Sequence, residues 1–251
     1  SQIEPGEYSP FHSRKLKNSF TEYDPERASK MLDSLGLTER DSEGMRTFRD
    51  GSRMTWNIDF TDYTGEGPVQ FVVDDWAAVG IRATQRERAR PLFATEKKVL
   101  KHDFTVWSGE SEFNPLVQPR SFVPTYSESH FAPGYGQWYN RGGMFAGEKI
   151  EGDRFIEPPP GSPVRKAMEL LDRAYSEADE ATRLELIEQI MDINAEEVWS
   201  ISISTPPPEL VVVKNGFRNV PKVALVGASY NTPGNTGIDT YFIEDPQDSE
   251  A

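Results

Sequence analysis

Residues 69–84 read VQFVVDDWAAVGIRAT, and this stretch decides the fold. Apolar side chains recur at helical spacing through most of it, at Val69, Val72, Val73, Trp76 and Val79. Gly80 is typical of a helix end, and residues 81–84 then have the composition of a short strand. The stretch therefore predicts a helix that leads, through a glycine, directly into a strand.

The sequence on either side repeats this alternation of elements. Upstream, Met54, Trp56, Ile58 and Phe60 alternate with other residues, which predicts a strand over residues 54–60 with one buried face. Downstream, we expect a helix over residues 90–100 and a strand over residues 104–107. The order strand, helix, strand, helix, strand predicts a parallel sheet with right-handed crossovers. Ligands of such sheets bind beyond the carboxyl ends of the strands.

Helices are also expected outside this unit. Asp24 and Pro25 suit the start of a helix that ends near Gly36. Ser162 caps a second helix, whose expected inward residues are Val164, Met168, Leu171 and Tyr175. A third helix is predicted over residues 181–198, and strands are predicted over residues 199–203, 210–213 and 241–243. The expected fold class is mixed α/β, a central mixed sheet flanked by helices.

The stretch over residues 102–139 opens with the last strand of the first unit and then becomes long and irregular. It carries many aromatic rings among prolines, glycines and small polar residues. Disordered segments contain few aromatic residues, so an ordered aromatic surface beside a ligand cleft is the better interpretation. The candidate ligand-binding residues are Trp107, Ser108, Asn114, Arg120, Tyr126, Trp138 and Tyr139.

All of these candidates except Ser108 also have a purely structural interpretation. Trp107 stands at a strand end, where it could contact a ligand or cap the core. The rings of Tyr126, Trp138 and Tyr139 could pack the loop onto its own scaffold. Asn114 precedes a proline and is typical of turns, and Arg120 could bind a carboxylate or backbone carbonyl groups.

Composition excludes several classes of function. Aspartate and glutamate number 41 against 27 lysines and arginines, a net charge of -14, so nucleic acid is not an expected partner. The chain has no cysteine, and His12, His102 and His130 are scattered, so no metal or cofactor is expected. No apolar run approaches the roughly 20 residues that a membrane span requires.

Several short motifs resemble one family when they are taken together and in order. They are Tyr23–Ala28 (YDPERA), Trp76–Ile81 (WAAVGI), Asn114–Leu116 (NPL), Pro119-Arg120, Phe122–Pro124 (FVP), Trp138-Tyr139, Ala195–Ile201 (AEEVWSI) and Lys214–Pro221 (KNGFRNVP). The chain resembles the family 5 solute-binding proteins of ABC importers, which are receptors for peptides, nickel and oligosaccharides. The resemblance covers nearly the whole chain.

The resemblance implies one lobe of a two-lobe receptor with the type II periplasmic-binding-protein fold. Residues 1–22 would enter from a missing amino-terminal lobe, residues 23–220 would form the carboxyl-terminal ligand-binding lobe, and residues 221–251 would return toward the first lobe. Such a receptor is not an enzyme. Its expected partners are a peptide or oligosaccharide ligand and the ABC permease subunits in the membrane. It would be exported to the periplasm or the extracellular face, with its signal sequence outside these residues.

Two other classes of protein remain open at this point. Glu110 and Glu112 could act as the acid and base of a glycoside hydrolase, which uses two carboxylates. The aromatic stretch could instead be a patch that binds another protein.

Overall fold

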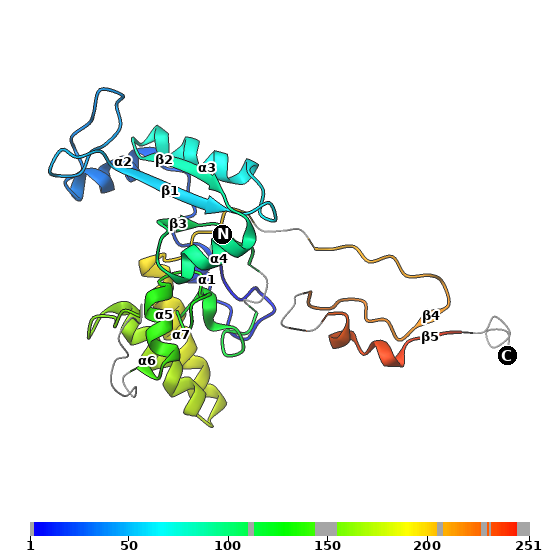
Figure 1. Cartoon of the computed structure of the whole chain (residues 1–251). Helices are drawn as coiled ribbons and strands as arrows, with labels where there is room; N and C mark the ends of the chain where they lie inside the picture. Colours follow the sequence, from blue (N-terminus) through cyan, green and yellow to red (C-terminus); the bar gives the residue numbers. More distant parts are fainter. Residues whose placement is uncertain are drawn as a thin grey trace.

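A computed structural model gives the fold and describes residues 3–109, 113–143, 155–204, 208–226, 230 and 232–244. Strands and helices alternate in the first half of the chain, and helices dominate the part that follows (Figure 1). An extended arm then carries the last strands away from the rest of the molecule (Figure 1). The described residues confirm the predicted class, mixed α/β.

The first half contains the predicted strand-helix unit. Its elements are β1 (Thr55–Phe60), α3 (Gly67–Ala78), β2 (Arg82–Glu87), α4 (Arg90–Lys98) and β3 (Phe104–Thr105). The strands run parallel in the order β2-β1-β3, with Ile58 opposite both Gln85 and Phe104. The parallel sheet is confirmed, although β2 extends further than expected and β3 is shorter.

This sheet has a small apolar core on one face. Ile58, Phe60 and Val69 are buried together, and the partly buried apolar residues around them come from α3, β2 and the residue after β3. The opposite face of β1 buries a charge instead, because Asp59 is only 2% exposed. The sheet unit is therefore held partly by apolar packing and partly by ion pairs.

The helix α2 (Pro25–Ser34) and a tight turn pack against this unit. The Asp24 carboxylate accepts a hydrogen bond from the Arg27 amide at 2.8 Å, as an N-cap does. A tight turn is present at Gly51, since the Phe48 amide donates to the Ser52 carbonyl at 2.9 Å. One isolated bridge, between Thr47 and Arg53, joins the two arms of this turn.

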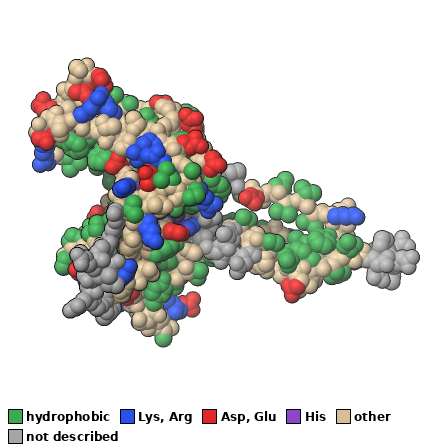
Figure 2. All heavy atoms as spheres, viewed as in Figure 1, with side chains coloured by type: hydrophobic (Ala, Val, Ile, Leu, Met, Phe, Trp, Pro, Cys, Tyr) green, Lys and Arg blue, Asp and Glu red, His purple; other side chains and the backbone are tan. Residues whose placement is uncertain are grey.

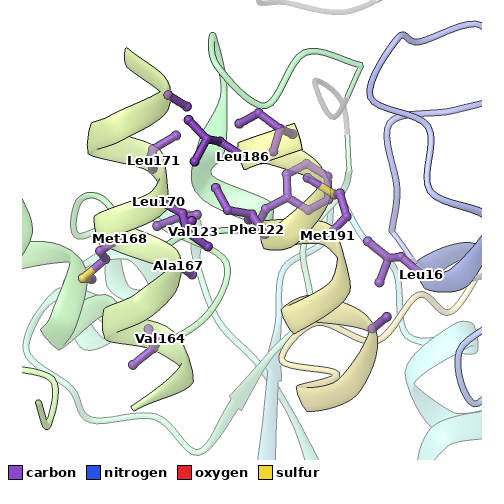
Figure 3. Packing of buried hydrophobic residues seen from close by; sticks show 14 of the residues in the cluster. Leu16, Phe122, Val123, Val164, Ala167, Met168, Leu170, Leu171, Leu186 and Met191 are labelled. Carbon is purple, nitrogen blue, oxygen red and sulfur yellow. The ribbon is translucent and has the colours of Figure 1, made fainter. Parts of the chain in front are cut away.

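The main core lies between helices. It is formed by α6 (Pro163–Ser176) and α7 (Glu180–Glu197), with α1 (Arg14–Lys17) against α7. Side chains from both long helices meet there, and Phe122 and Val123 from the irregular stretch insert between them (Figure 3). Ser162 and Asp179 cap the two helices through the amides of Arg165 and Thr182. The two predicted helices are confirmed to within one residue at the ends of α7.

One inward residue of α6 was predicted wrongly. Tyr175 is 51% exposed, whereas its neighbour Ala174 is buried. The buried stripe of α6 runs through Val164, Ala167, Leu171 and Ala174. The next buried residue after Leu171 is therefore Ala174, three positions on, and not Tyr175, four positions on.

Two predicted strands are absent from the described residues. Residues 199–203 and 210–213 have no ladder partner, because apolar composition alone provides no neighbouring strand. The predicted strand at residues 241–243 is present as β5 (Phe242–Ile243), which pairs antiparallel with β4 (Phe217–Arg218). The short 3-10 helices η4 (Gly234–Thr236) and η5 (Ile238–Thr240) lie between these strands in sequence.

Candidate functional site

The three parallel strands end at a common edge, and the residues that follow them meet there. Asp62 and Tyr63 follow β1, Arg88 and Arg90 follow β2, and Trp107 follows β3. A surface hollow at this edge is lined by Asp62, Tyr63, Glu87, Arg88, Ala89 and Arg90, and we name it the strand-end hollow. It occupies the position at which open α/β sheets bind ligands.

Trp107 forms an aromatic support beside the strand-end hollow. Its ring stacks on Phe93 at a centroid distance of 5.5 Å and an interplanar angle of 28°. The Tyr63 ring lies 5.8 Å away, and the guanidinium of Arg90 lies over the Trp107 ring at 5.2 Å. Trp107 is half-buried and its contacts join all three strand ends, so it holds the edge together.

Alternate arginines continue from the end of β2 toward this hollow. Arg86 makes two hydrogen bonds to the buried Asp59 carboxylate, at 2.7 and 3.0 Å, and these bonds raise the pKa of Arg86. Arg88 lies 3.0 Å from Glu96 and 3.7 Å from Asp59. Arg90, by contrast, has no ion pair with any described residue; its contact is with Trp107.

Sequence reasoning missed Tyr63 and the arginines. The signal was available, because Arg86, Arg88 and Arg90 occupy every second position across the end of β2 and the start of α4. Tyr63 lies just past the end of β1, where side chains of a parallel sheet converge. Both signals are meaningful only if the three strands are known to be neighbours.

Of the predicted residues, Trp107 and Ser108 lie at this edge. The Ser108 hydroxyl is buried and has no hydrogen-bond partner within the described part of the chain. A buried hydroxyl in that position lacks the bond that such groups usually make. These two residues therefore stay ligand-binding predictions in a place that suits them.

Asn114, Arg120 and Tyr126 lie along the irregular stretch that follows. The side-chain oxygen of Asn114 accepts the Leu116 amide at 3.0 Å, which is turn chemistry. Arg120 is half-buried in η1 (Pro119–Ser121), and its carbonyl accepts the His130 amide at 2.9 Å. The Tyr126 backbone passes so close to Gly136 that a Cβ at that position would clash with it.

Trp138 and Tyr139 lie in a different place. Both belong to α5 (Pro133–Asn140), a helix within the stretch predicted to be irregular. Trp138 is buried against α6, where the Arg165 guanidinium lies 4.5 Å from its ring. The Tyr139 hydroxyl donates to Asp172, and burial raises the pKa of this phenol. These two rings line a separate hollow with α6, which shares no residue with the strand-end hollow.

Two buried basic groups lie where the sheet unit meets the irregular stretch. Lys97 on α4 donates to the Glu128 carbonyl at 3.2 Å, and burial lowers its pKa to about 8. His130 bonds to the Ser121 hydroxyl at 3.1 Å, and burial lowers its pKa to about 3, so it is neutral at pH 7. Glu110 and Glu112, the candidate acid and base, lie outside the described residues.

The residues that the structure describes contain neither a cluster of metal-binding side chains nor a membrane-spanning helix. There, no three histidine, aspartate or glutamate side chains gather as they would around a metal ion. No helix in the same residues has the length and apolar character needed to cross a membrane.

Comparisons with known proteins find similarity in structure and not in sequence. No protein-family profile and no curated protein matches the sequence. Among solved structures, an oligopeptide-binding protein, OppA, is similar over 97% of this chain with a TM-score of 0.68 and 26% identity. The periplasmic binding protein MelB of Agrobacterium fabrum, solved with stachyose, is similar over 81% with a TM-score of 0.63 and 16% identity.

The fold is that of type II periplasmic binding proteins. A third structure agrees, a periplasmic oligopeptide-binding protein of Thermotoga maritima with bound mannohexaose, similar over 76% of this chain with a TM-score of 0.52 and 19% identity. This chain covers 39% of the OppA chain, 29% of MelB and 33% of the Thermotoga protein. It thus spans about a third of each, and these proteins are named as binding proteins.

Proposed function

We propose that this chain is the carboxyl-terminal lobe of a solute-binding receptor that serves an ABC importer, and that it has no catalytic activity of its own. The observation that carries the proposal is the strand-end hollow, which brings Tyr63 and Arg90 together at the carboxyl edge of a parallel sheet with Trp107 beside them. The similarity to type II periplasmic binding proteins supports the same reading. The ligand would be an oligopeptide or an oligosaccharide, as the names of the neighbours suggest.

In this proposal the ligand is held between two lobes, and closure supplies much of the binding free energy. Residues 1–22 lead in from the amino-terminal lobe, residues 23–220 form the lobe itself, and residues 221–251 return toward the first lobe. The arm with β4 and β5 supports this division, because it exposes many apolar side chains that a second lobe could cover (Figure 2). Among these are Leu210 and Val223, exposed by 91% and 88%.

The remaining features follow from the proposed class of protein. The receptor would work outside the cytoplasmic membrane, in the periplasm or on the extracellular face, and would deliver its ligand to the permease subunits. The ligand-binding residues proposed from the sequence at the edge are Trp107 and Ser108. Tyr63 and Arg90 join them on the basis of their contacts.

Isothermal titration calorimetry tests the proposal directly. The 251-residue chain and the two-lobe protein would each be titrated with a panel of tetra- and pentapeptides and with stachyose. We expect measurable binding by the two-lobe protein and weak or no binding by the single lobe, which offers half the contacts and cannot exclude water. Tight binding by the single lobe would contradict the lobe assignment.

The strand-end hollow has its own test in the two-lobe protein. Trp107→Ala removes the ring that Tyr63, Phe93 and Arg90 contact, so ligand affinity should fall at least tenfold. Trp56→Ala is the matched control, because Trp56 is at the opposite end of the sheet, in the first half of β1. Equal affinity losses in both variants would point to general destabilisation rather than to a binding edge.

A further inference from the structure

The strand-end hollow collects charged side chains at the carboxyl edge of the sheet. Elsewhere in the unit the arginines are matched, as Arg86 is with Asp59 and Arg82 is with Asp41 and Glu43. Arg90, Asp62 and Glu87 all line the hollow or its rim, and none of them forms an ion pair with a described residue. Within the described part of the chain, the hollow therefore presents the Arg90 guanidinium and the Asp62 and Glu87 carboxylates, none of them in an ion pair, to whatever enters it.

The Trp107 ring beside these charges already contacts two other side chains. Phe93 stacks on Trp107, and the Arg90 guanidinium lies over the same ring at 5.2 Å. A sugar ring binds an indole by covering an open face, and here Arg90 would first have to move. The contact instead limits the motion of a long flexible side chain and holds its guanidinium at the edge of the hollow.

We propose that Arg90 binds a carboxylate of the ligand, and that the strand-end hollow takes a charged peptide in preference to a neutral oligosaccharide. A guanidinium forms two parallel hydrogen bonds with a carboxylate, which makes it the matching group for a peptide terminus or an acidic side chain. Asp62 and Glu87 are placed to favour the ammonium groups that peptides also carry. A neutral sugar would leave all three charges without partners.

The inference rests on the proposed function, since it names the ligand class of the same site. Its test uses the two-lobe protein and four versions of the tightest-binding peptide of the panel, with stachyose as the neutral probe. The peptide would carry a free or an amidated carboxyl terminus, combined with either glutamate or glutamine at one internal position. Calorimetry would measure affinities for the parent protein and for Arg90→Gln, Arg90→Lys and Lys98→Gln.

The expected result is selective loss. Arg90→Gln should weaken binding of the peptide that carries the recognised carboxylate by ten- to a hundredfold and leave the peptide without it unchanged. Arg90→Lys should bind more tightly than Arg90→Gln but less tightly than the parent, because lysine keeps the positive charge and lacks the two parallel N–H donors of a guanidinium. Lys98→Gln, the same charge change at an exposed position of α4 outside the hollow, should have no effect. Unchanged thermal melting would show that the variants are folded.

Two results would overturn the inference and leave the proposed function standing. One is equal binding of all four peptide versions with no effect of Arg90→Gln. The other is tighter binding of stachyose than of every peptide. If neither peptides nor stachyose bind the two-lobe protein, the proposed function fails and the inference fails with it.

Discussion

The helical core and the sheet unit of this chain are stabilised in different ways. Among the residues that the structure describes, fifteen buried apolar side chains fill the helical core around α6 and α7, whereas three occupy the apolar core of the sheet unit. The sheet unit compensates with buried charge, because Arg46 and Asp59 are 1% and 2% exposed and both are paired. The region that forms the strand-end hollow is thus the one that depends on ion pairs, and the helical core serves as its support.

The largest effect should come from the ring that joins the irregular stretch to the helical core. Phe122→Ala should lower the free energy of unfolding by about 4 kcal/mol, because a ring that is 1% exposed leaves a cavity between α6 and α7. Urea unfolding of the 251-residue chain at pH 7 measures it. Phe71→Ala on α3 is the control, since that ring is 71% exposed and its loss should change stability by less than about 0.5 kcal/mol.

A loss of unfolding free energy below about 1 kcal/mol for Phe122→Ala would contradict the contrast drawn between the helical core and the sheet unit. It would mean that the stretch around residue 122 lies on the helical core without being part of it.

The next effect concerns Lys97, which is buried where α4 of the sheet unit meets the irregular stretch. Its pKa is about 8 in the folded chain against 10.5 in the unfolded chain, so between these values the unfolded chain binds more protons. The free energy of unfolding should therefore rise with pH across this window, by up to about 3 kcal/mol at 1.4 kcal/mol per pKa unit. Below pH 8 the full penalty of the buried charge remains.

Lys97→Met isolates this contribution. The difference in unfolding free energy between the parent chain and Lys97→Met should shift in favour of the parent as pH rises from 7.5 to 10.5. Taking this difference removes the contribution of the tyrosines, which also titrate at high pH but are the same in both chains. Lys98→Met, on the same helix but exposed, should show no such shift. A flat difference for Lys97→Met would show that the ammonium reaches solvent.

The smallest of these effects tests the ion pairs of the sheet unit. Arg46 donates to Asp33 at 2.5 Å, to the Ser29 hydroxyl at 2.8 Å and to the Val79 carbonyl at 2.8 Å, which ties α2 to the end of α3. Arg46→Leu should cost about 2 kcal/mol, less than a fully buried pair, because Asp33 is 52% exposed. Arg49→Leu is the control, as Arg49 is exposed and its side chain bonds only to the Leu35 carbonyl among the described residues.

Urea unfolding measures both variants. Equal losses for Arg46→Leu and Arg49→Leu would show that the buried guanidinium is no more important than a surface one, and the contrast between the two regions would then disappear.

Much of the architecture could be predicted because periodicity is local. The spacing of Val69, Val72 and Trp76 predicted α3, and the sheet followed from the order of elements. The caps at Asp24 and Ser162 predicted the starts of α2 and α6. Apolar runs without a partner failed as predictors, as residues 199–203 and 210–213 show, because a strand is defined by its neighbour.

The candidate site was predicted only in part. Trp107 was placed correctly at a strand end, since its position follows from the strand that precedes it. Trp138 and Tyr139 were expected on the same surface, but they lie in α5. That helix forms despite its two glycines because Gly136 lets the Tyr126 backbone pack against it. Helix propensity of the segment was low, and tertiary packing overrode it.

The sequence by itself determined the order of helices and strands, the parallel direction of the sheet and the edge at which its strands end. These follow from side-chain spacing and from chain connectivity, which involve residues close together in the chain. Only the tertiary structure decided that Phe122 and Trp138 are core, that Lys97 is buried, and that Tyr63, Arg90 and Trp107 meet. Burial and charge pairing depend on which distant residue lies opposite, and no local pattern carries that information.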